Sequence, residues 1–257
     1  ALVDGGDAVG DRFESIENLG GTAYDDQLAG DASANTLTGN DGADVLDGRA
    51  GNDHLQGGGG DDLLTGGAGA DVLAGGAGSD TVNYADGTAG VQVNLATGVG
   101  LGGEAEGDRL SGIEHAVGGT GNDTLVGTGD SNRLVGGKGD DLLEGGAGAD
   151  LLEGGEGSNT ASYAGAAAGV VAHLLQPGLN TGDAAGDVYT DIAHLIGSAH
   201  ADTLLGTAAA NRLDGGAGDD LLVGGAGADT LVGGDGSDGT DYSLSSAAVV
   251  VDLAAGT

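Results

Sequence analysis

The stretch Gly66-Gly67-Ala68-Gly69-Ala70-Asp71-Val72-Leu73-Ala74 is one unit of a tandem repeat that organises the chain. It follows the pattern G-G-x-G-x-D-x-L-x, in which x varies. Leucine recurs every nine residues from Leu28 to Leu73, Val82 continues the phase, and Asp or Asn stands two residues before each. A fixed nine-residue period predicts a repeat architecture, in which each unit packs only against its neighbours.

Seventeen such units form three blocks that are separated by spacers. The sixth position is Asp in thirteen units and Asn in four, and the eighth is Leu in all but the last unit of each block. We therefore expect these segments: a partial spacer at 1–20, a seven-repeat block at 21–83, a spacer at 84–117, a five-repeat block at 118–162, a spacer at 163–196, a five-repeat block at 197–241 and a partial spacer at 242–257.

The spacers share a pattern of their own. Tyr84, Tyr163 and Tyr242 are each 79 residues apart, and packing at the end of a block is the favoured role for them. Apolar residues at alternate positions, as at Val91 and Val93, predict a strand. The spacers should rejoin the stack in phase, because an apolar residue lies nine positions before the first leucine of each block, at Leu19, Ala116 and Leu195.

The composition excludes several classes of protein. The chain has 257 residues with 60 Gly but a single Pro, so it is not collagen. A formal net charge of −35 disfavours binding to nucleic acid and to anionic membranes. Cysteine is absent, so no disulfide stabilises the fold. No stretch is long and apolar enough to span a membrane, so we expect no membrane insertion.

The repeat predicts an all-β fold. The segment x-L-x suits a short strand whose leucine points inward, and G-G-x-G-x-D suits a tight turn in which glycine supplies unusual backbone angles. One nonapeptide is then half a turn of a flattened coil, and units i and i+2 stack on the same side. The expected architecture is a parallel β-roll (β-solenoid) in three blocks with β-rich spacers.

Such a coil needs a ligand in its turns. Ordering nine residues costs more backbone entropy than one buried leucine returns, and 41 acidic residues repel one another. Ca²⁺ prefers six to eight hard oxygen ligands, which stacked Asp carboxylates and glycine carbonyls supply. Zn²⁺ prefers Cys or His, and Mg²⁺ demands stricter geometry.

The pattern resembles the RTX family, the haemolysin-type calcium-binding repeats. The resemblance implies a parallel β-roll, calcium-triggered folding outside the cell and export by a type I secretion system. We expect about ten Ca²⁺ ions. The predicted ligands are the sixth-position residues Asp26, Asp44, Asp53, Asp62, Asp71, Asp80, Asp123, Asp141, Asp150, Asn159, Asp202, Asp220, Asp229 and Asp238, with the fourth-position glycines Gly42, Gly51, Gly60, Gly69, Gly78, Gly121, Gly139, Gly148, Gly157, Gly218, Gly227 and Gly236.

Alternate loops should share an ion. The expected pairs are Asp44 with Asp62, Asp53 with Asp71, Asp62 with Asp80, Asp123 with Asp141, Asp202 with Asp220, and Asp220 with Asp238. The second unit of each block should bind weakly or not at all, because it carries Asn35, Asn132 or Asn211. Asp11, Asp108 and Asp187 in the spacers fit an extra calcium site and a plain turn equally well. Arg133 and Arg212 are expected to be solvated rather than to replace calcium as charge partners.

Two functions remain open. The first is an extracellular structural region of an adhesin, surface layer or fibre, with calcium, its own ends (head to tail) or a cell surface as partners. The second is an accessory or secretion module of a secreted epimerase, lipase or metalloprotease whose catalytic domain lies outside this chain. Neither H-E-x-x-H nor G-x-S-x-G occurs, so we expect no enzyme activity in the chain itself.

Overall fold

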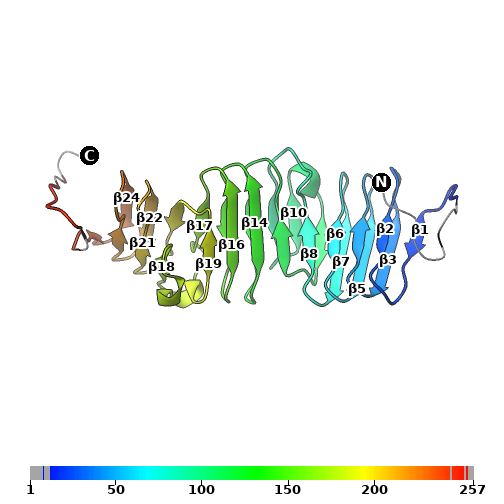
Figure 1. Ribbon diagram of the computed structural model, residues 1–257, viewed down its shortest axis with the longest axis horizontal. Helices are drawn as coiled ribbons and strands as arrows, with labels where there is room; N and C mark the ends of the chain where they lie inside the picture. The colour runs from blue at the N-terminus through cyan, green and yellow to red at the C-terminus, as the bar shows by residue number, and fades with distance from the viewer. Residues whose placement is uncertain (1–7, 9–11, 244, 252, 254–257) are drawn as a thin grey trace. The chain divides into compact units, whose positions relative to one another are not determined.

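The computed structural model describes residues 8, 12–243, 245–251 and 253. It is built almost entirely of short strands, and it divides into two compact units. Unit 1 comprises residues 1–127 with 133–139, and unit 2 comprises residues 128–132 with 140–257. Asp11 and most of the partial spacer before it lie outside the described residues. Each unit is a parallel β-solenoid, which confirms the predicted fold class (Figure 1).

The described residues of unit 1 form fourteen strands and a short helix between β10 and β11. One of its sheets has the order β1-β3-β5-β7-β11-β10-β9-β13, and the other has the order β14-β12-β8-β6-β4-β2. The elements are β1 (Asn18–Gly20), β2 (Gln27–Ala29), β3 (Thr36–Asp41), β4 (Val45–Asp47), β5 (His54–Gly59), β6 (Leu63–Thr65), β7 (Val72–Ala77), β8 (Thr81–Asn83), β9 (Gln92–Asn94), β10 (Val99–Leu101), the 3-10 helix η2 (Gly103–Ala105), β11 (Arg109–Ser111), β12 (His115–Val117), β13 (Thr124–Val126) and β14 (Arg133–Lys138).

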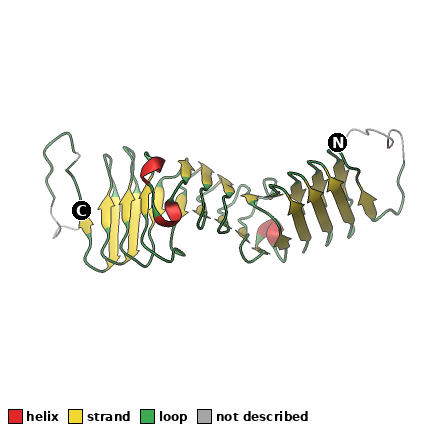
Figure 2. Ribbon diagram, turned by 90° about the horizontal axis from the view of Figure 1, so that it is seen from below, coloured by secondary structure: helices red, strands yellow, loops and turns green. Residues whose placement is uncertain are grey.

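Unit 2 repeats the arrangement with its own strands. Its strand orders are β15-β17-β20-β22-β24, β16-β19 and β18-β21-β23-β25. The short helices are in red among the loops of Figure 2. The elements are β15 (Leu142–Glu144), β16 (Leu151–Glu156), β17 (Thr160–Ser162), β18 (Val171–His173), the 3-10 helices η3 (Pro177–Leu179) and η4 (Gly182–Ala184), β19 (Val188–Thr190), β20 (His194–Ile196), β21 (Thr203–Leu205), β22 (Arg212–Ala217), β23 (Leu221–Val223), β24 (Thr230–Asp235) and β25 (Gly239–Thr240).

The strand register confirms that two nonapeptides make one coil. Leu37 pairs with Leu55, and Leu46 on the opposite side pairs with Leu64, so each partner lies eighteen residues on. The eighth-position side chains from Leu37 to Leu222 are buried and form two ladders inside the coil, whereas Leu28 and Leu231 near its ends are half-buried. Since the flanking residues of each x-L-x strand are exposed or half-buried, these ladders are the hydrophobic core.

The strands are longer on one side of the coil than the x-L-x pattern predicts. β3, β5 and β7 each contain six residues, whereas β4 and β6 contain three. The extra residues belong to the following turn, where Asn40 pairs with Gly58. The cause is that the glycine-rich turn backbone on this side also forms a ladder.

The spacers rejoin the coil in phase, as predicted. Leu19 pairs with Leu37, Ala116 with Leu134 and Leu195 with Leu213, each eighteen residues on. The predicted strand containing Val93 is β9, and Val93 is buried against Leu125 in a parallel pair. The first spacer also adds antiparallel pairs, because β10 turns back on β9 and β11 follows it.

The three tyrosines of the spacers differ in exposure. Tyr84 and Tyr163 are buried, as expected for packing at the end of a block. Tyr242 is 39% exposed. The difference follows from what surrounds each ring, since β11 and β19 return to the coil after Tyr84 and Tyr163 respectively.

Candidate metal centre

The sixth-position aspartates form a hydrogen-bonded ladder through the turns. The N–H of Asp44 donates to Oδ1 of Asp62 at 2.8 Å, and the N–H of Asp62 donates to Oδ1 of Asp80 at 2.8 Å. On the opposite side, the N–H of Asp53 donates to Oδ1 of Asp71 at 2.7 Å. One oxygen of each carboxylate is thus used to hold the stack of turns together.

The second oxygen of these carboxylates is buried and has no hydrogen-bond partner among the described residues. A buried acceptor without a partner carries a desolvation cost that a bound cation removes. We call a turn open when its aspartate has such an Oδ2. The open turns are those of Asp44, Asp53, Asp62, Asp71, Asp80, Asp150 and Asp220.

A carbonyl oxygen converges on the same place in several open turns. A Cβ added to Gly57 would collide with Oδ2 of Asp62 and would lie 2.7 Å from the carbonyl oxygen of Gly75. A Cβ on Gly48 would lie 2.5 Å from Oδ2 of Asp53 and 2.7 Å from the carbonyl oxygen of Gly66. The first glycine of the unit therefore leaves room for two oxygen atoms that face each other.

These donors fit calcium. They are carboxylate and carbonyl oxygens on a flexible backbone, the hard ligands that Ca²⁺ takes at 2.3–2.6 Å. Within the described part of the chain, no three or more His, Cys, Asp or Glu side chains gather into a site. A cation in these turns would be held by one or two carboxylates together with carbonyl oxygens, and Ca²⁺ when bound would supply the positive charge that these oxygens lack.

Burial acts on the ionisation of the open carboxylates. Desolvation raises the pKa of Asp62 and Asp71 to about 6 and that of Asp150 to about 7, with further upward contributions from neighbouring carboxylates. Backbone N–H donors oppose this rise. The ionised ladder is consequently unfavourable without a cation, because like charges are buried close together.

Comparison with known families agrees with this geometry. The family described as RTX calcium-binding nonapeptide repeat (4 copies) matches residues 20–55, 47–82, 110–131, 126–161, 196–231 and 205–239, more than half of the chain. The chain belongs to this RTX family. A search of curated proteins gave no match to the chain.

The fourth-position glycines of the RTX repeats have a clear conformational role. Gly60 has φ of 125°, and a Cβ there would collide with the carbonyl oxygen of Gly42 in the turn below. Only glycine adopts this left-handed backbone without strain. The same left-handed φ occurs at Gly42, Gly51, Gly69, Gly78, Gly139, Gly148, Gly157, Gly218, Gly227 and Gly236, but not at Gly121.

Most of the expected aspartate pairs stack directly. Besides the pairs of Asp44, Asp53 and Asp62, the N–H of Asp202 donates to Asp220 at 2.8 Å, and that of Asp220 donates to Asp238 at 3.1 Å. Asp123 and Asp141 are divided between the two units. Asp229 accepts the N–H of Asn211 at 3.0 Å, and its turn is half-buried, whereas Asp238 is exposed.

The remaining predicted ligands already have partners for their side chains. Asp26, Asp123 and Asp202 each accept a backbone N–H from the second residue of their own turn. The side-chain amide of Asn159 donates to the carbonyl of Asp191 at 3.0 Å, while its oxygen accepts the N–H of Asp141. Sequence reasoning gave these residues the same role as the aspartates of the open turns.

The spacer aspartates extend the ladder. Asp108 accepts the N–H of Asp71 at 2.8 Å, and Asp187 accepts that of Asp150 at 2.9 Å. Their second oxygens accept the hydroxyls of Tyr84 at 2.8 Å and Tyr163 at 2.7 Å. The shared 79-residue spacing of the tyrosines and the aspartates marked them as equivalent positions of the spacers, but it gave no signal for the contacts themselves.

A Ser–His contact recurs but is not a nucleophile with its base. Nε2 of His115 lies 2.7 Å from Oγ of Ser79, while Nδ1 accepts the N–H of Arg133 at 2.9 Å. The neutral ring therefore carries its proton on Nε2 and donates it to the serine, so it cannot accept the serine proton. The same arrangement occurs at Ser158, His194 and Arg212.

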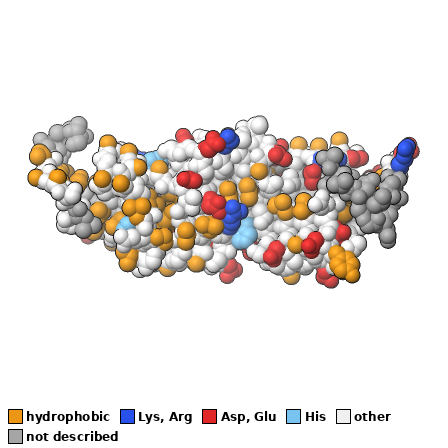
Figure 3. Space-filling view, in the orientation of Figure 1, with side chains coloured by type: hydrophobic (Ala, Val, Ile, Leu, Met, Phe, Trp, Pro, Cys, Tyr) orange, Lys and Arg blue, Asp and Glu red, His pale blue; other side chains and the backbone are white. Residues whose placement is uncertain are grey.

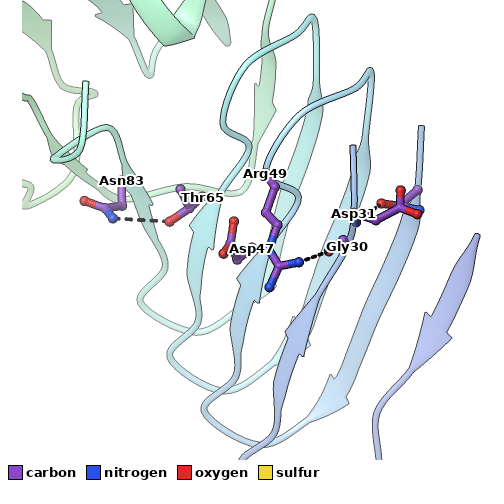
Figure 4. Close-up of polar contacts among 7 residues, drawn as sticks. Gly30, Asp31, Asp47, Arg49, Thr65 and Asn83 are labelled. Atoms are coloured by element: carbon purple, nitrogen blue, oxygen red, sulfur yellow. Dashed lines mark hydrogen bonds and ion pairs between the residues drawn. The ribbon is translucent and has the colours of Figure 1, made fainter. Parts of the chain in front are cut away.

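The arginines contact backbone and carboxylate groups. The guanidinium of Arg212 lies 2.7 Å from Asp214, a partner two residues on along β22. Arg49 donates to the carbonyl oxygen of Gly30 at 2.7 Å and lies 3.8 Å from Asp47 (Figure 4). Both guanidinium groups belong to exposed side chains, whereas Asp214 is half-buried.

Proposed function

We propose that this chain is a calcium-dependent structural region of an extracellular protein of the adhesin, surface-layer or fibre type. In this proposal Ca²⁺ binds between stacked turns after secretion and drives the chain from a disordered state into the β-roll. The observation that carries the proposal is the row of buried Oδ2 atoms without hydrogen-bond partners, which recur in phase with the leucine ladders. No alternative partner for these oxygens is offered by the described residues.

The charge of the chain supports coupling between binding and folding. The visible face in Figure 3 carries scattered Asp and Glu side chains and few Lys or Arg. With 41 acidic and 6 basic residues, compaction without cations brings like charges together. Divalent ions reduce that repulsion, because they bind to the buried carboxylates of the open turns.

An extracellular location suits this chemistry. Extracellular calcium modules bind with dissociation constants of about 10⁻⁴–10⁻³ M. A chain with such affinity stays unfolded where calcium is scarce and folds where it is plentiful, which is compatible with export through a type I secretion system. No helix in the described portion of the chain is long and apolar enough to cross a membrane.

A structural role is favoured over a catalytic one. The chain consists of repeats and spacers, and the recurrent Ser–His contact has the wrong proton arrangement for a nucleophile. The accessory module of a secreted enzyme differs from the proposal in what flanks the repeats. Sequencing of the flanking gene segments distinguishes the two, because a catalytic domain beside the repeats would favour the accessory module.

Calcium-dependent folding is tested directly by circular dichroism. In excess chelator the chain should be largely disordered, and added Ca²⁺ should convert it to β-structure with a midpoint of about 10⁻⁴–10⁻³ M. Mg²⁺ at the same concentration is the control, and it should give much less β-structure because it dehydrates reluctantly. A chain with the same β-structure content in chelator as in Ca²⁺ would refute the proposal.

A further inference from the structure

The first two turns of each block differ from those that follow. The N–H of the residue four positions earlier donates to the second carboxylate oxygen of Asp in the first turn and to the amide oxygen of Asn in the second turn. We call such turns closed. The contacts are Thr22 to Asp26 at 2.5 Å, Gly119 to Asp123 at 2.7 Å and Ser198 to Asp202 at 2.5 Å in the first turns, and Asp31 to Asn35 at 2.7 Å, Thr128 to Asn132 at 2.6 Å and Thr207 to Asn211 at 2.6 Å in the second turns.

The backbone explains the difference. In the later turns the second residue has left-handed φ, as at Gly58 with 122°, and even Asn40 and Arg49 adopt it with 82° and 74°. Positive φ is unusual for non-glycine residues, so the turn itself imposes this conformation. None of the second residues of the six closed turns has positive φ. The sign of φ at this position therefore separates N–H groups that bond the carboxylate from those that leave it open.

The closed turns of the first block also have internal donors on their backbone carbonyls. The side-chain amide of Asn40 donates to the carbonyl oxygen of Gly21 at 2.9 Å. The guanidinium of Arg49 donates to that of Gly30, as drawn in Figure 4. Both carbonyls belong to the first glycine of a closed turn. The carbonyl oxygens that lie beside the closed side chains of Asp26 and Asn35 are those of Gly39 and Gly48, as in the open turns, so the N–H bonds to the side chains, and not the carbonyls, distinguish closed turns from open ones.

One of the two aspartate ladders is also closed where it meets each of the two complete spacers. The Oδ2 of Asp108, which would otherwise resemble the open oxygens, accepts the buried hydroxyl of Tyr84. Asp187 and Tyr163 form the same pair in unit 2, where Tyr163 also contacts the hydroxyl of Tyr189. A neutral phenol therefore occupies the position at which the open turns have no partner.

We propose that each block is a separate calcium cassette, in which cation sites begin only after the two closed turns and, in the first two blocks, stop at the tyrosine–aspartate pair of the spacer. The two closed turns and the tyrosine–aspartate pair hold together without metal, and Asp26, Asp123, Asp202, Asp108 and Asp187 are not calcium ligands. This inference rests on the proposed calcium-binding function and refines it. For the spacer aspartates, it favours a role without bound metal over an extra calcium site.

The first test compares isosteric variants of the full chain. Calcium bound per folded chain is counted by equilibrium dialysis with atomic absorption, for Asp26→Asn, Asp108→Asn and Asp62→Asn. We expect the first two to retain the wild-type count, while Asp62→Asn loses at least one ion. Asp108→Asn keeps an acceptor for the N–H of Asp71, and its amide can donate to the Tyr84 hydroxyl, so the variant preserves the local packing.

The second test opens a closed turn. The triple variant Thr207→Gly, Ala209→Gly, Asn211→Asp gives residues 206–211 the sequence found at 66–71, the open turn of Asp71. We expect it to bind one more ion than the wild type. Asn211→Asp alone is the matched control, and it should gain none, because the N–H and Oγ of Thr207 still hold the side chain at 2.6 Å and 3.1 Å.

The outcomes separate this inference from the proposed function. A wild-type chain that binds no calcium removes the proposed function and the cassettes together. If the wild type binds calcium but Asp26→Asn or Asp108→Asn loses an ion, the cassette boundaries are wrong while the function stands. A folded triple variant without an additional ion, or a gain in the single control, also overturns the boundaries.

Discussion

At the scale of single residues, the first glycine of each unit matters because of what lies beside its Cα. At Gly57, the Oδ2 of Asp62 and the carbonyl oxygen of Gly75 occupy the space that a side chain would need. Both atoms are proposed calcium ligands, so even a methyl group changes the site. Glycine is thus required here for close approach, whereas at Gly60 it is required for its left-handed φ.

A methyl group at Gly57 should therefore weaken calcium binding. We expect Gly57→Ala to raise the calcium midpoint and to destabilise the calcium-bound chain by about 1–3 kcal/mol, the range for overpacking a filled site. The matched control is Gly129→Ala, since a Cβ on Gly129 meets nothing within 4 Å. Calcium titrations followed by circular dichroism measure both variants. Equal midpoints for the two would show that the space beside Gly57 is not part of a cation site.

The raised pKa values of the open aspartates predict how pH acts on the metal-free chain. Their folded-state pKa values, about 6 for Asp62 and about 7 for Asp150, lie above the ordinary aspartate value of 3.8 because burial raises them. The folded state therefore binds more protons than the unfolded state. The resulting stability is fully present below about pH 4 and is lost as pH rises through about 6 to 7.

In chelator, β-structure should consequently increase on acidification from neutral pH to about pH 5. At about pH 6, calcium binding should release protons, because the ions require ionised carboxylates. Circular dichroism in chelator and calorimetry in two buffers of different ionisation enthalpy measure these effects. Metal-free β-structure that decreases on acidification would contradict the assigned direction of the pKa shifts.

At the scale of elements, the spacers in our proposal continue the coil between blocks without bound metal. Tyr84 reaches the buried Asp108, and β11 then pairs with β7 so that the parallel stack continues. This contact satisfies a carboxylate oxygen that burial would otherwise leave without a donor. The phenol thus holds the start of the spacer against Asp108, whose other oxygen accepts the N–H of Asp71 in the block.

Loss of that phenol should destabilise the spacer. Tyr84→Phe leaves Oδ2 of Asp108 buried without its donor, so we expect the free energy of unfolding in saturating calcium to fall by about 1–3 kcal/mol. Tyr242→Phe is the control, because Tyr242 is 39% exposed. Chemical denaturation monitored by circular dichroism gives both values. A loss no greater than that of the control would show that the hydroxyl of Tyr84 contributes nothing.

Much of the element structure follows from the nonapeptide period. Leu37, Leu46 and Leu55 lie where the repeat places them, because a buried side chain every nine residues leaves only one stacking register. The closed turns did not follow from the motif. Gly119 and Gly58 both occupy the second position, yet only Gly58 has positive φ. Glycine permits both conformations, so residue type alone does not decide between them.

The contacts of the spacers could not be predicted from the nonapeptide period, for a different reason. Asp108 meets Asp71 across 37 residues, a separation that includes β9, β10 and η2 and is not a multiple of nine. A repeat period predicts contacts only between units that follow it. The 79-residue spacing indicated that Tyr84 and Asp108 belong to equivalent spacers, but it did not indicate that they touch.

At the scale of the whole chain, stability and charge depend on the same ions. Each unit is a solenoid whose turns contact mainly their neighbours, so its stability is close to a sum of local contributions. In our proposal, closed turns and tyrosine–aspartate pairs contribute to this stability without metal. Open turns contribute to it only when a cation is bound to their carboxylates. The net charge of −35 adds a repulsion that acts on the full length of the chain.

The most direct test of this account is hydrogen–deuterium exchange of the intact chain, measured by mass spectrometry in excess chelator and in millimolar Ca²⁺. Backbone N–H groups of the open turns, such as those of Asp44 and Asp62 that bond the next carboxylate, should exchange rapidly in chelator and become strongly protected in Ca²⁺. Equal protection of these groups in both conditions would contradict the claim that bound calcium stabilises the β-roll.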